Sequence, residues 1–291
     1  MFVCNSCPRK CNIDRDSVTG ICGVPAAYKV ARAALHFWEE PCISGEKGSG
    51  TVFFSGCSLK CVFCQNFEIS RNAFGKEISE EKLIEIFKDL ENQGAHNINL
   101  VNPTHYSAQL SETLRKYKPS IPVVWNTGGY DSVESLRKLD GLVDIYLADI
   151  KYVSESVSKK YSGAENYFSV ASQAVLEMQS QVGENVFDEN GIMKKGLIIR
   201  HLVLPGNVSQ AFRVMDWVKE NLPEDTILSL MSQYTPCGKA CEYPTINRRL
   251  SEREYDLVLD YAEKLDFENV FIQEIESSSK DFIPDFDLTG I

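Results

Sequence analysis

Beyond residue 50, short apolar runs rich in Val, Ile and Leu alternate with longer stretches in which apolar side chains recur every three or four residues. The short runs are typical of buried strands, and the longer stretches predict amphipathic helices. We expect strands over residues 51–56, 98–103, 121–127, 143–150, 195–206, 226–234 and 269–274. We expect helices over residues 79–94, 107–118, 132–139, 154–161, 166–181, 209–222 and 251–265.

The repeated alternation of strand and helix predicts an α/β fold with a parallel sheet, because parallel neighbours are usually joined through a helix. Either a barrel or an open doubly wound sheet satisfies this pattern. In a barrel, functional side chains gather at the carboxyl ends of the strands. Polar or Gly/Pro-marked segments follow five of the predicted strands, at residues 57–64, 102–105, 126–129, 149–151 and 205–207. We expect these segments to meet at one rim.

Composition narrows the class of protein. The 291 residues suffice for one large α/β domain or two smaller ones, and 43% of them are hydrophobic. No run approaches the ~20 consecutive apolar residues of a membrane span, and the N-terminus, MFVCNSCPRK, lacks the apolar stretch of a secretory signal. We therefore expect a cytoplasmic protein with no membrane partner. The formal net charge of −11 argues against a broad phosphate-binding surface, so nucleic acid is not an expected partner.

Ten cysteines in such a chain point to metal or redox chemistry, because disulfides are rare in a reducing compartment. A first group lies in CNSCPRKCNIDRDSVTGIC and consists of Cys4, Cys7, Cys11 and Cys22. Four thiolates at such spacings can close a tetrahedral zinc site or hold an auxiliary iron–sulfur cluster, and the spacing does not choose between the two metals. Cys237 and Cys241, with Cys42, either add ligands to a further site or remain reduced thiols.

A second group, Cys57, Cys61 and Cys64, begins two residues after the apolar run TVFF. A structural zinc site requires four ligands, and a catalytic zinc usually draws on His or a carboxylate. Three thiolates on a short loop suit a [4Fe–4S] cluster that leaves its fourth iron without a protein ligand. The alternative, three buried structural cysteines, fits less well because the loop also carries polar side chains such as Lys60 and Gln65.

This CxxxCxxC spacing, with the aromatic Phe63 before the last cysteine, resembles the signature of the radical S-adenosylmethionine (SAM) superfamily. The wider stretch LHFWEEPCISGEKGSGTVFFSGCSLKCVFCQNFEIS resembles proteins related to pyruvate formate-lyase activating enzyme. The segments CPRKC, VNPTHY, LADIKY, IIRHLVLPGN and MSQYTPC belong to the same pattern. The resemblance therefore covers nearly the whole chain.

The resemblance implies a partial, TIM-like (β/α)6 barrel over residues 49–276, with an N-terminal cysteine-rich extension over 1–48 and a tail over 277–291. It implies a [4Fe–4S] cluster on the three cysteines of the second group, whose free iron binds the amino and carboxylate groups of SAM. One electron from the reduced cluster then gives methionine and a 5′-deoxyadenosyl radical, which abstracts a hydrogen atom. The protein would position the target C–H bond and exclude water.

The resemblance also supplies candidate cofactor contacts. They are Phe63, Asn66, Thr104, Asn126, Thr127, Asp149, Lys151, Arg200 and His201. Asn66 matches a family position that touches SAM. Asp149 and Lys151 lie where related enzymes contact its carboxylate and ribose, and the alternative is an ion pair that caps strand ends. Arg200 and His201 suit the nucleotide or the substrate, or else form a packed pair at a strand end.

One segment departs from the family pattern. Superfamily members commonly carry a Gly-Gly-Glu-like segment after the second strand, which holds the amino group of SAM, but this chain has Asn102-Pro103-Thr104-His105. Thr104 or the neighbouring backbone would then take over that contact. His105 either faces the substrate or is a hydrogen-bonded structural histidine.

Three functions follow as hypotheses. The resemblance favours an activase that installs a glycyl radical in a partner enzyme, with flavodoxin or ferredoxin as electron donor. A radical enzyme acting on a small molecule or a peptide is the alternative, because the added cysteines and the altered second-strand segment distinguish the chain from a simple activase. A non-catalytic iron–sulfur electron carrier or redox sensor would explain the cysteines but not the polar rim.

Overall fold

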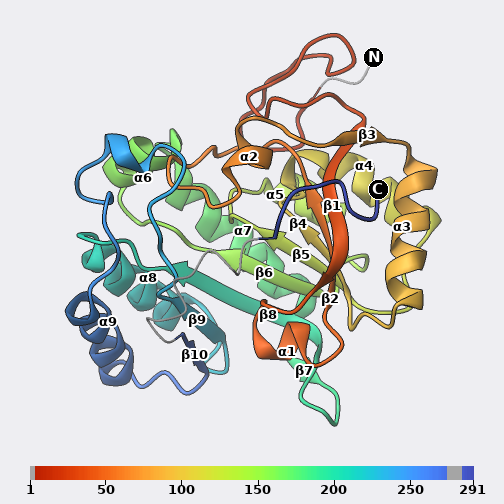
Figure 1. The fold of residues 1–291 in the computed structure, drawn as a ribbon. Helices are drawn as coiled ribbons and strands as arrows, with labels where there is room; N and C mark the ends of the chain where they lie inside the picture. Colours follow the sequence, from red (N-terminus) through yellow and green to blue (C-terminus); the bar gives the residue numbers. More distant parts are fainter. Residues whose placement is uncertain (1–3, 274–283) are drawn as a thin grey trace.

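A ten-stranded sheet runs through the protein in the computed structural model, which describes residues 4–273 and 284–291 (Figure 1). Its strands are β1 (Tyr28–His36), β2 (Ser49–Phe54), β3 (Lys76–Ile78), β4 (Ile98–Val101), β5 (Val123–Thr127), β6 (Ile145–Asp149), β7 (Val186–Phe187), β8 (Met193–Leu202), β9 (Ile227–Met231) and β10 (Val270–Ile272). Seven of them, from β2 through β4, β5, β6, β8 and β9 to β10, lie side by side in chain order and run parallel. The predicted parallel α/β sheet is thus confirmed.

Two strands, β1 and β7, run against this direction. β1 pairs antiparallel with β2 and β7 pairs antiparallel with β8, whereas β3 pairs antiparallel with β1 and so runs in the direction of β2. In the described part of the chain, β10 and β3 stand at the two ends of the strand order, so the sheet is open and forms no closed barrel. β1 lies inside the segment 1–48 that the sequence assigns to an N-terminal extension. The division of the chain at residues 48 and 276 stays a prediction.

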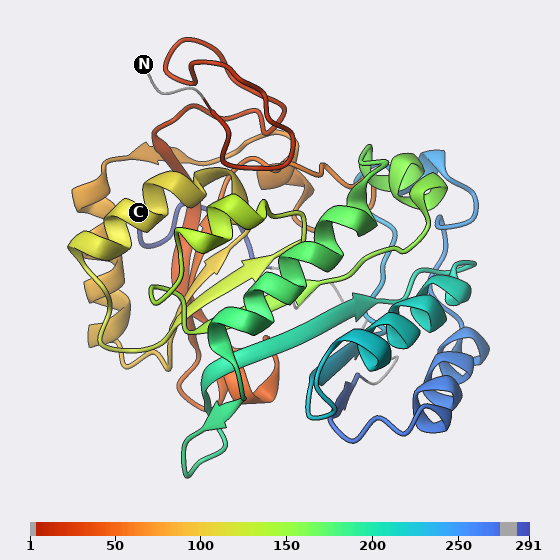
Figure 2. The same ribbon diagram turned by 180° about the vertical axis from the view of Figure 1, so that it is seen from behind.

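The helices lie mainly over one face of the sheet (Figure 2). They are α1 (Pro41–Ser44), α2 (Phe67–Ser70), α3 (Glu80–Asn92), α4 (Ser107–Lys116), α5 (Val133–Arg137), α6 (Glu155–Ser162), α7 (Tyr167–Val182), α8 (Val208–Asn221) and α9 (Glu252–Lys264), with short 3-10 turns at Thr104–Tyr106 and Ala240–Glu242. The main core forms between these helices and the sheet, where Leu100, Trp125 and Ile199 are fully buried. This arrangement leaves the opposite side of the parallel strands available for a site.

Each strand and helix predicted from the pattern is present, with ends that differ by a few residues. Ser79 begins α3 as predicted, because its hydroxyl accepts a hydrogen bond from the Lys82 backbone at 3.2 Å. The last predicted strand, 269–274, is β10, and its final residue lies outside the described residues. The pattern missed β1, β3 and β7, as well as the short helices α1 and α2.

The two ends of the described chain contact different elements of the fold. The N-terminal segment contacts the first turns of α4 and α5, because Ser107 and Ser135 both donate to the Ser6 carbonyl at 3.0 Å. At the other end, the Ala33 amide in β1 donates to Thr289 at 2.8 Å. The predicted C-terminal tail over 277–291 therefore lies along β1 from residue 284 onward, and residues 277–283 are outside the described part. No helix among the described residues is long and apolar enough to cross a membrane.

Candidate active site

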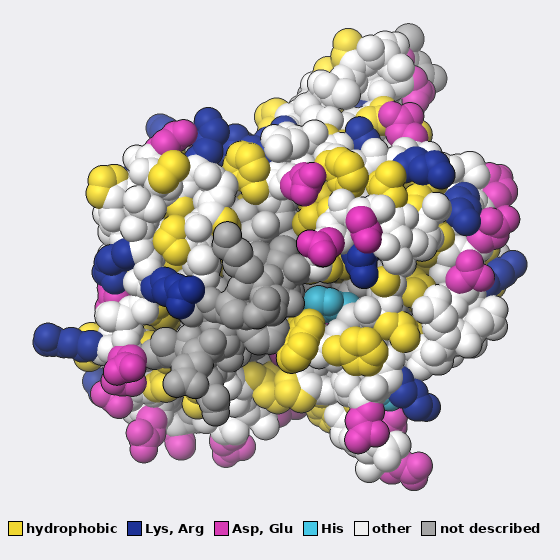
Figure 3. All heavy atoms as spheres, viewed as in Figure 1, with side chains coloured by type: hydrophobic (Ala, Val, Ile, Leu, Met, Phe, Trp, Pro, Cys, Tyr) yellow, Lys and Arg dark blue, Asp and Glu magenta, His cyan; other side chains and the backbone are white. Residues whose placement is uncertain are grey.

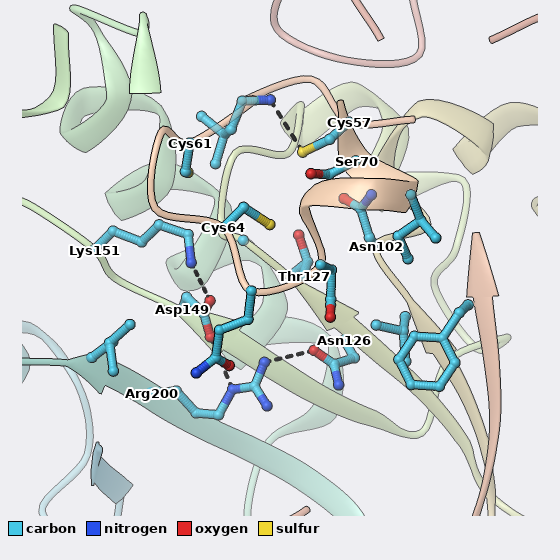
Figure 4. Close-up of a pocket in the computed structure, with 18 of the residues that line it drawn as sticks. Cys57, Cys61, Cys64, Ser70, Asn102, Asn126, Thr127, Asp149, Lys151 and Arg200 are labelled. Carbon is cyan, nitrogen blue, oxygen red and sulfur yellow. Dashed lines mark hydrogen bonds and ion pairs between the residues drawn. The ribbon is translucent and has the colours of Figure 1, made fainter. Parts of the chain in front are cut away.

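A pocket opens where the carboxyl ends of β2, β4, β5 and β6 meet, and it encloses about 250 Å³ (Figure 4). Of the five polar segments expected at one rim, four line this pocket and residues 205–207 do not. Its lining includes the predicted contacts Cys57, Phe63, Asn66, Cys61, Cys64, Thr104, Asn126, Thr127, Asp149, Lys151 and Arg200. The structure thus brings together residues that are up to 143 positions apart (from 57 to 200) in the sequence.

Asp149, at the end of β6, forms ion pairs with both cations of the pocket. The Lys151 ammonium contacts its Oδ2, and Nε of Arg200 in β8 lies 2.9 Å from its Oδ1. Burial works to raise the pKa of Asp149, but the charges of Lys151 and Arg200 outweigh it and hold the pKa below its usual value. Arg200 also donates to Asn126 Oδ1 at 2.6 Å. The carboxylate is therefore charged, and the guanidinium is held in one orientation.

Glu39 approaches the same guanidinium from the segment between β1 and α1. Its Oε2 lies 3.1 Å from Nη1 of Arg200, and its Oε1 accepts from Asn99 at 3.1 Å and from Asn126 at 3.0 Å. Burial raises the pKa of Glu39, and the positive charge of Arg200 opposes this. We call Glu39, Asp149, Lys151 and Arg200 the charged network. Sequence reasoning assigned no role to Glu39, although its segment, WEEP, belongs to the stretch that carries the family resemblance.

The carboxyl groups around Arg200 outnumber the cations. Glu40 Oε2 lies 4.0 Å from Arg200 Nη1, is buried and has no hydrogen-bond partner among the described residues. Burial raises the pKa of Glu40, and the neighbouring Arg200 opposes this. Three carboxyl groups thus share Lys151 and Arg200. One negative charge is left without a counter-charge unless one carboxyl group is protonated or a bound molecule supplies positive charge. The pocket therefore favours a ligand that carries positive charge.

The three cysteines of the loop after β2 line the pocket opposite the charged network (Figure 4). Cys57 Sγ accepts from the Leu59 backbone at 3.4 Å, and Cys61 Sγ lies 2.9 Å from the Ser162 hydroxyl. Burial raises the pKa of Cys61, and it raises that of Cys64 to about 12. Both thiols are therefore protonated near neutral pH until a metal ion displaces the proton.

The Ser70 hydroxyl lines this pocket beside Cys64. It is buried and has no hydrogen-bond partner other than Cys64 among the described residues. A hydrogen bond from this hydroxyl lowers the pKa of Cys64, against the larger effect of burial. Ser70 can therefore donate to the Cys64 sulfur when that sulfur carries negative charge.

The arrangement of the cysteines differs from that of a mononuclear metal site. None of the ten cysteines, all of which lie among the described residues, forms a disulfide. Within residues 4–273 and 284–291, no group of three or more His, Cys, Asp or Glu side chains is arranged to hold a metal ion. In a [4Fe–4S] cluster each thiolate binds a different iron, so three spread thiols on one loop fit such a cluster better than they fit a single ion.

His201 and His105 do not line the pocket. Nδ1 of His201 donates to the Ile150 carbonyl at 2.7 Å, and burial lowers the His201 pKa to about 4. Nε2 of His105 contacts the Ser55 carbonyl at 2.8 Å, and burial lowers the His105 pKa to about 3. Both imidazoles are neutral and held by the backbone, which matches the structural reading that the sequence left open for His105.

The four N-terminal cysteines lie close together beside the loop. Cys4, Cys7 and Cys22 are buried and Cys11 is half-buried. Burial raises the pKa of Cys7 to about 12, and the charges of the other three thiols add to this effect. The Cys22 carbonyl accepts from the Cys57 backbone at 3.2 Å, so this group touches the cysteine loop directly. Whether it holds zinc or an auxiliary cluster stays a prediction.

The remaining cysteines have different surroundings. Cys42 is buried in α1, and burial together with the charge of Glu40 raises its pKa to about 12. Cys237 is half-buried and donates to the Phe63 carbonyl at 3.1 Å, whereas Cys241 is exposed. The segment after β9 thus packs against the cysteine loop, but Cys237 does not line the pocket.

Aromatic side chains border the pocket where β1 ends. His36 and Trp38 line it, and Trp38 is 61% exposed beside Phe37, which is 50% exposed. Figure 3 shows hydrophobic side chains gathered on this face, around α1. An apolar surface at a pocket entrance is suited to contact a substrate or a partner protein.

The sequence was compared with models of known protein families and with known proteins. The family model of the Radical SAM superfamily matches residues 51–180, which include the cysteine loop, Asp149 and Lys151. The Uncharacterized protein MJ0674 of Methanocaldococcus jannaschii is 33% identical over 278 residues, which cover 92% of this chain and 76% of that protein.

Among solved structures, Streptococcus suis SuiB bound to its precursor peptide SuiA is similar over 76% of this chain, with a TM-score of 0.51 and 13% identity. A structure of SuiB bound to S-adenosylmethionine aligns over 75% of this chain, with a TM-score of 0.46 and 14% identity. The chain spans about half the length of SuiB, since the alignments cover 48% and 45% of that protein. The likeness to SuiB concerns the fold.

Proposed function

The chain belongs to the radical SAM superfamily, and we propose on this premise that it is an enzyme that cleaves SAM reductively beside a [4Fe–4S] cluster held by Cys57, Cys61 and Cys64. One observation carries the proposal. The three thiols line the same pocket as the charged network, so a metal cluster and a charged ligand would meet in one enclosed space.

The residues present fit both groups. Three free thiols on one loop are the donors that such a cluster requires, and the buried Ser70 hydroxyl beside Cys64 has no other partner among the described residues. SAM bears a sulfonium and an ammonium group against one carboxylate, so its net charge is positive. The excess of carboxyl groups around Arg200 and Lys151 complements that charge, and the two cations suit its carboxylate.

When bound, the reduced cluster supplies one electron to SAM, which yields methionine and a 5′-deoxyadenosyl radical able to abstract a hydrogen atom from a substrate. The chain's own part is to bind and orient. Asp149 pairs with Nε of the Arg200 guanidinium and Glu39 pairs with its Nη1, and Asn126 Oδ1 accepts a hydrogen bond from its Nη2. Asn66 and Thr127 line the same pocket as the thiols and this guanidinium, and they contact the cofactor in our proposal.

We further propose that the substrate is the backbone of a partner protein, in which a glycine is converted to a glycyl radical. The sequence resemblance to pyruvate formate-lyase activating enzyme supports this. The exposed Phe37 and Trp38 at the pocket entrance also support it, because a protein partner would cover them. Flavodoxin or ferredoxin would supply the electron.

A radical enzyme that modifies a peptide or a small molecule is the second candidate. The departure of residues 102–105 from the Gly-Gly-Glu pattern favours it, and the structural neighbour SuiB is described with a bound precursor peptide. A non-catalytic electron carrier is the least favoured, because it would have no use for a ligand cavity of about 250 Å³ lined by buried charges.

The test is anaerobic reconstitution of the full chain with iron and sulfide, followed by reduction with dithionite in the presence of SAM. The proposal expects 5′-deoxyadenosine and methionine in equal amounts, and loss of both products in Cys61→Ala. The matched control is Cys241→Ser, which removes an exposed thiol and leaves product formation unchanged. Absence of 5′-deoxyadenosine with a loaded cluster would overturn the enzyme proposal in favour of an electron carrier.

A second measurement separates the substrate classes. Mixing the reduced enzyme and SAM with a candidate glycyl-radical enzyme should give the doublet of a glycine-centred radical in electron paramagnetic resonance (EPR) spectra. If no such signal forms and deuterium from a labelled peptide or small molecule enters 5′-deoxyadenosine instead, the second candidate is correct.

A further inference from the structure

A chain of hydroxyl groups leads from the protein interior to one cysteine of the loop. The Ser162 hydroxyl lies 2.9 Å from Cys61 Sγ and 3.0 Å from the Tyr152 hydroxyl. Ser162 ends α6 and is 1% exposed, and Tyr152 is fully buried. These three groups therefore interact without competition from water.

Once Cys61 binds iron, chemistry decides which group donates in each hydrogen bond of this series of hydroxyl groups. A metal-bound thiolate carries no proton, so the Ser162 hydroxyl must donate to the sulfur. The oxygen of Ser162 is then free to accept, and Tyr152 donates to it. In such a chain each hydrogen bond polarises the next, so the Tyr152 hydroxyl strengthens the bond that Ser162 makes to the sulfur.

The backbone around Ser162 is fixed to the cysteine loop by a side chain from the N-terminal segment. Arg9 donates through Nη1 to the Gly163 carbonyl at 2.8 Å and through Nε to the Ser58 carbonyl at 2.8 Å. Val62 in the loop also donates its amide to the Tyr161 carbonyl at 2.8 Å. The distance between the Ser162 hydroxyl and the Cys61 sulfur is therefore set by three separate contacts.

We propose that Ser162 and Tyr152 are positioning residues that raise the reduction potential of the cluster held by Cys57, Cys61 and Cys64. This inference rests on the proposed function. Reduction adds negative charge that is shared with the ligand sulfurs, and a hydrogen bond to a sulfur stabilises the reduced state more than the oxidised state. The other two sulfurs lack such a hydroxyl chain among the described residues, because Cys57 accepts from a backbone amide at 3.4 Å and the Ser70 hydroxyl beside Cys64 has no further partner.

The experiment is a redox titration of the reconstituted full chain with dithionite, followed by EPR without SAM. Ser162→Ala should make the potential more negative, because the hydrogen bond to Cys61 is lost. The expected size is about tenfold in the reduction equilibrium, or roughly 59 mV for one electron, which is the effect of about one hydrogen bond to a charged group. Tyr152→Phe removes one oxygen atom, leaves the ring in place and should shift the potential by less in the same direction.

Tyr161→Phe is the matched control. Its ring packs in the same aromatic cluster, 6.4 Å from the centroids of both Phe63 and Tyr152, and its contact with the loop is made by the backbone. The potential of this variant should equal that of the unaltered chain. An equal shift in Tyr161→Phe would overturn the inference, because packing alone would then explain the effect.

Two further results separate the inference from the function on which it rests. If the unaltered chain and Ser162→Ala bind the cluster, cleave SAM and share one potential, the inference is wrong and the proposed function stands. If the unaltered chain binds no cluster of iron and sulfide, the proposed function fails and the inference fails with it. A shift in Ser162→Ala without one in Tyr152→Phe would contradict the hydroxyl chain.

Discussion

Glu39 and Arg200 form an ion pair across 161 positions of sequence, with 3.1 Å between Oε2 and Nη1. Glu39 comes from the segment that follows the antiparallel β1, whereas Arg200 lies within the parallel strand β8. Asp149 holds the same guanidinium through its Nε atom. The antiparallel edge of the sheet thus contributes a carboxylate to a site that is otherwise built from parallel strands.

Glu39→Gln should weaken SAM binding by about tenfold, because the amide cannot pair with the Arg200 guanidinium and would place a donor against it. The change keeps the shape of the side chain and an oxygen that can accept from Asn99 and Asn126. Isothermal titration of the cluster-loaded chain with SAM measures the effect. Glu46→Gln, an exposed glutamate just beyond α1, is the control and should bind SAM as the unaltered chain does. Equal affinities in all three proteins would show that Glu39 does not orient Arg200 for the cofactor.

The sequence predicted the parallel core of the fold well, because each of these strands and helices has a local signal. Strands such as β5 and β6 are continuous apolar runs, and α3 carries both an amphipathic pattern and an N-cap at Ser79. β1 was missed because YKVARAALH mixes helix-favouring and strand-favouring residues, and its conformation depends on pairing with β2. Its extended form is therefore decided by tertiary contacts.

The contrast between residues with a local sequence signal and residues placed by tertiary contacts also applies to the site. The cysteine loop and Asp149 were found because a motif or a strand end marks them in the sequence. Glu39 and Ser162 have no such mark, and their proximity to Arg200 and Cys61 arises from contacts that span more than 100 residues. The sequence offered His201 either as a contact to the nucleotide or substrate or as part of a packed pair at a strand end. Neighbours in a strand point to opposite faces, and the His201 imidazole turns to the Ile150 carbonyl while Arg200 faces the pocket.

Arg9→Lys should make the cluster easier to remove. Arg9 bridges the Ser58 and Gly163 carbonyls with two nitrogen atoms of one planar group, and lysine offers a single point charge that cannot span both. We expect iron to pass to a chelator about tenfold faster, which corresponds to the loss of roughly one such hydrogen bond. The rate of iron release, monitored by absorbance, is the measurement.

Lys10→Asn is the control in the same segment, since Lys10 is exposed and has a positive φ that asparagine tolerates. An unchanged release rate in Arg9→Lys would mean that the N-terminal segment does not stabilise the loop.

Metal analysis of a variant with Cys57, Cys61 and Cys64 all changed to Ala should find about one zinc per chain and no iron, if the N-terminal cysteines form a tetrahedral structural site. Binding would have to draw the four thiolates together, because the structure does not arrange them around a metal ion. Adding Cys7→Ser to this variant should abolish the zinc. Iron with sulfide in place of zinc would identify an auxiliary cluster.

The buried histidines make the stability of the protein depend on pH. Burial lowers the pKa of His201 from 6.5 to about 4, so between these values the unfolded chain binds a proton that the folded chain does not. The free energy of unfolding should therefore fall as the pH falls below 6.5, by up to about 1.4 kcal/mol per pH unit for this group. Urea unfolding of the metal-free, reduced protein at several pH values measures the slope.

His201→Asn isolates the contribution of this imidazole. The asparagine amide can donate to the Ile150 carbonyl in place of Nδ1 but has no proton to gain in this range. The variant should lose part of the slope between pH 6.5 and 4, while the slope from His105, whose pKa is lowered to about 3, remains. A slope identical to that of the unaltered chain would show that His201 is protonated in the folded protein, which its burial at 2% exposure and its single backbone partner argue against.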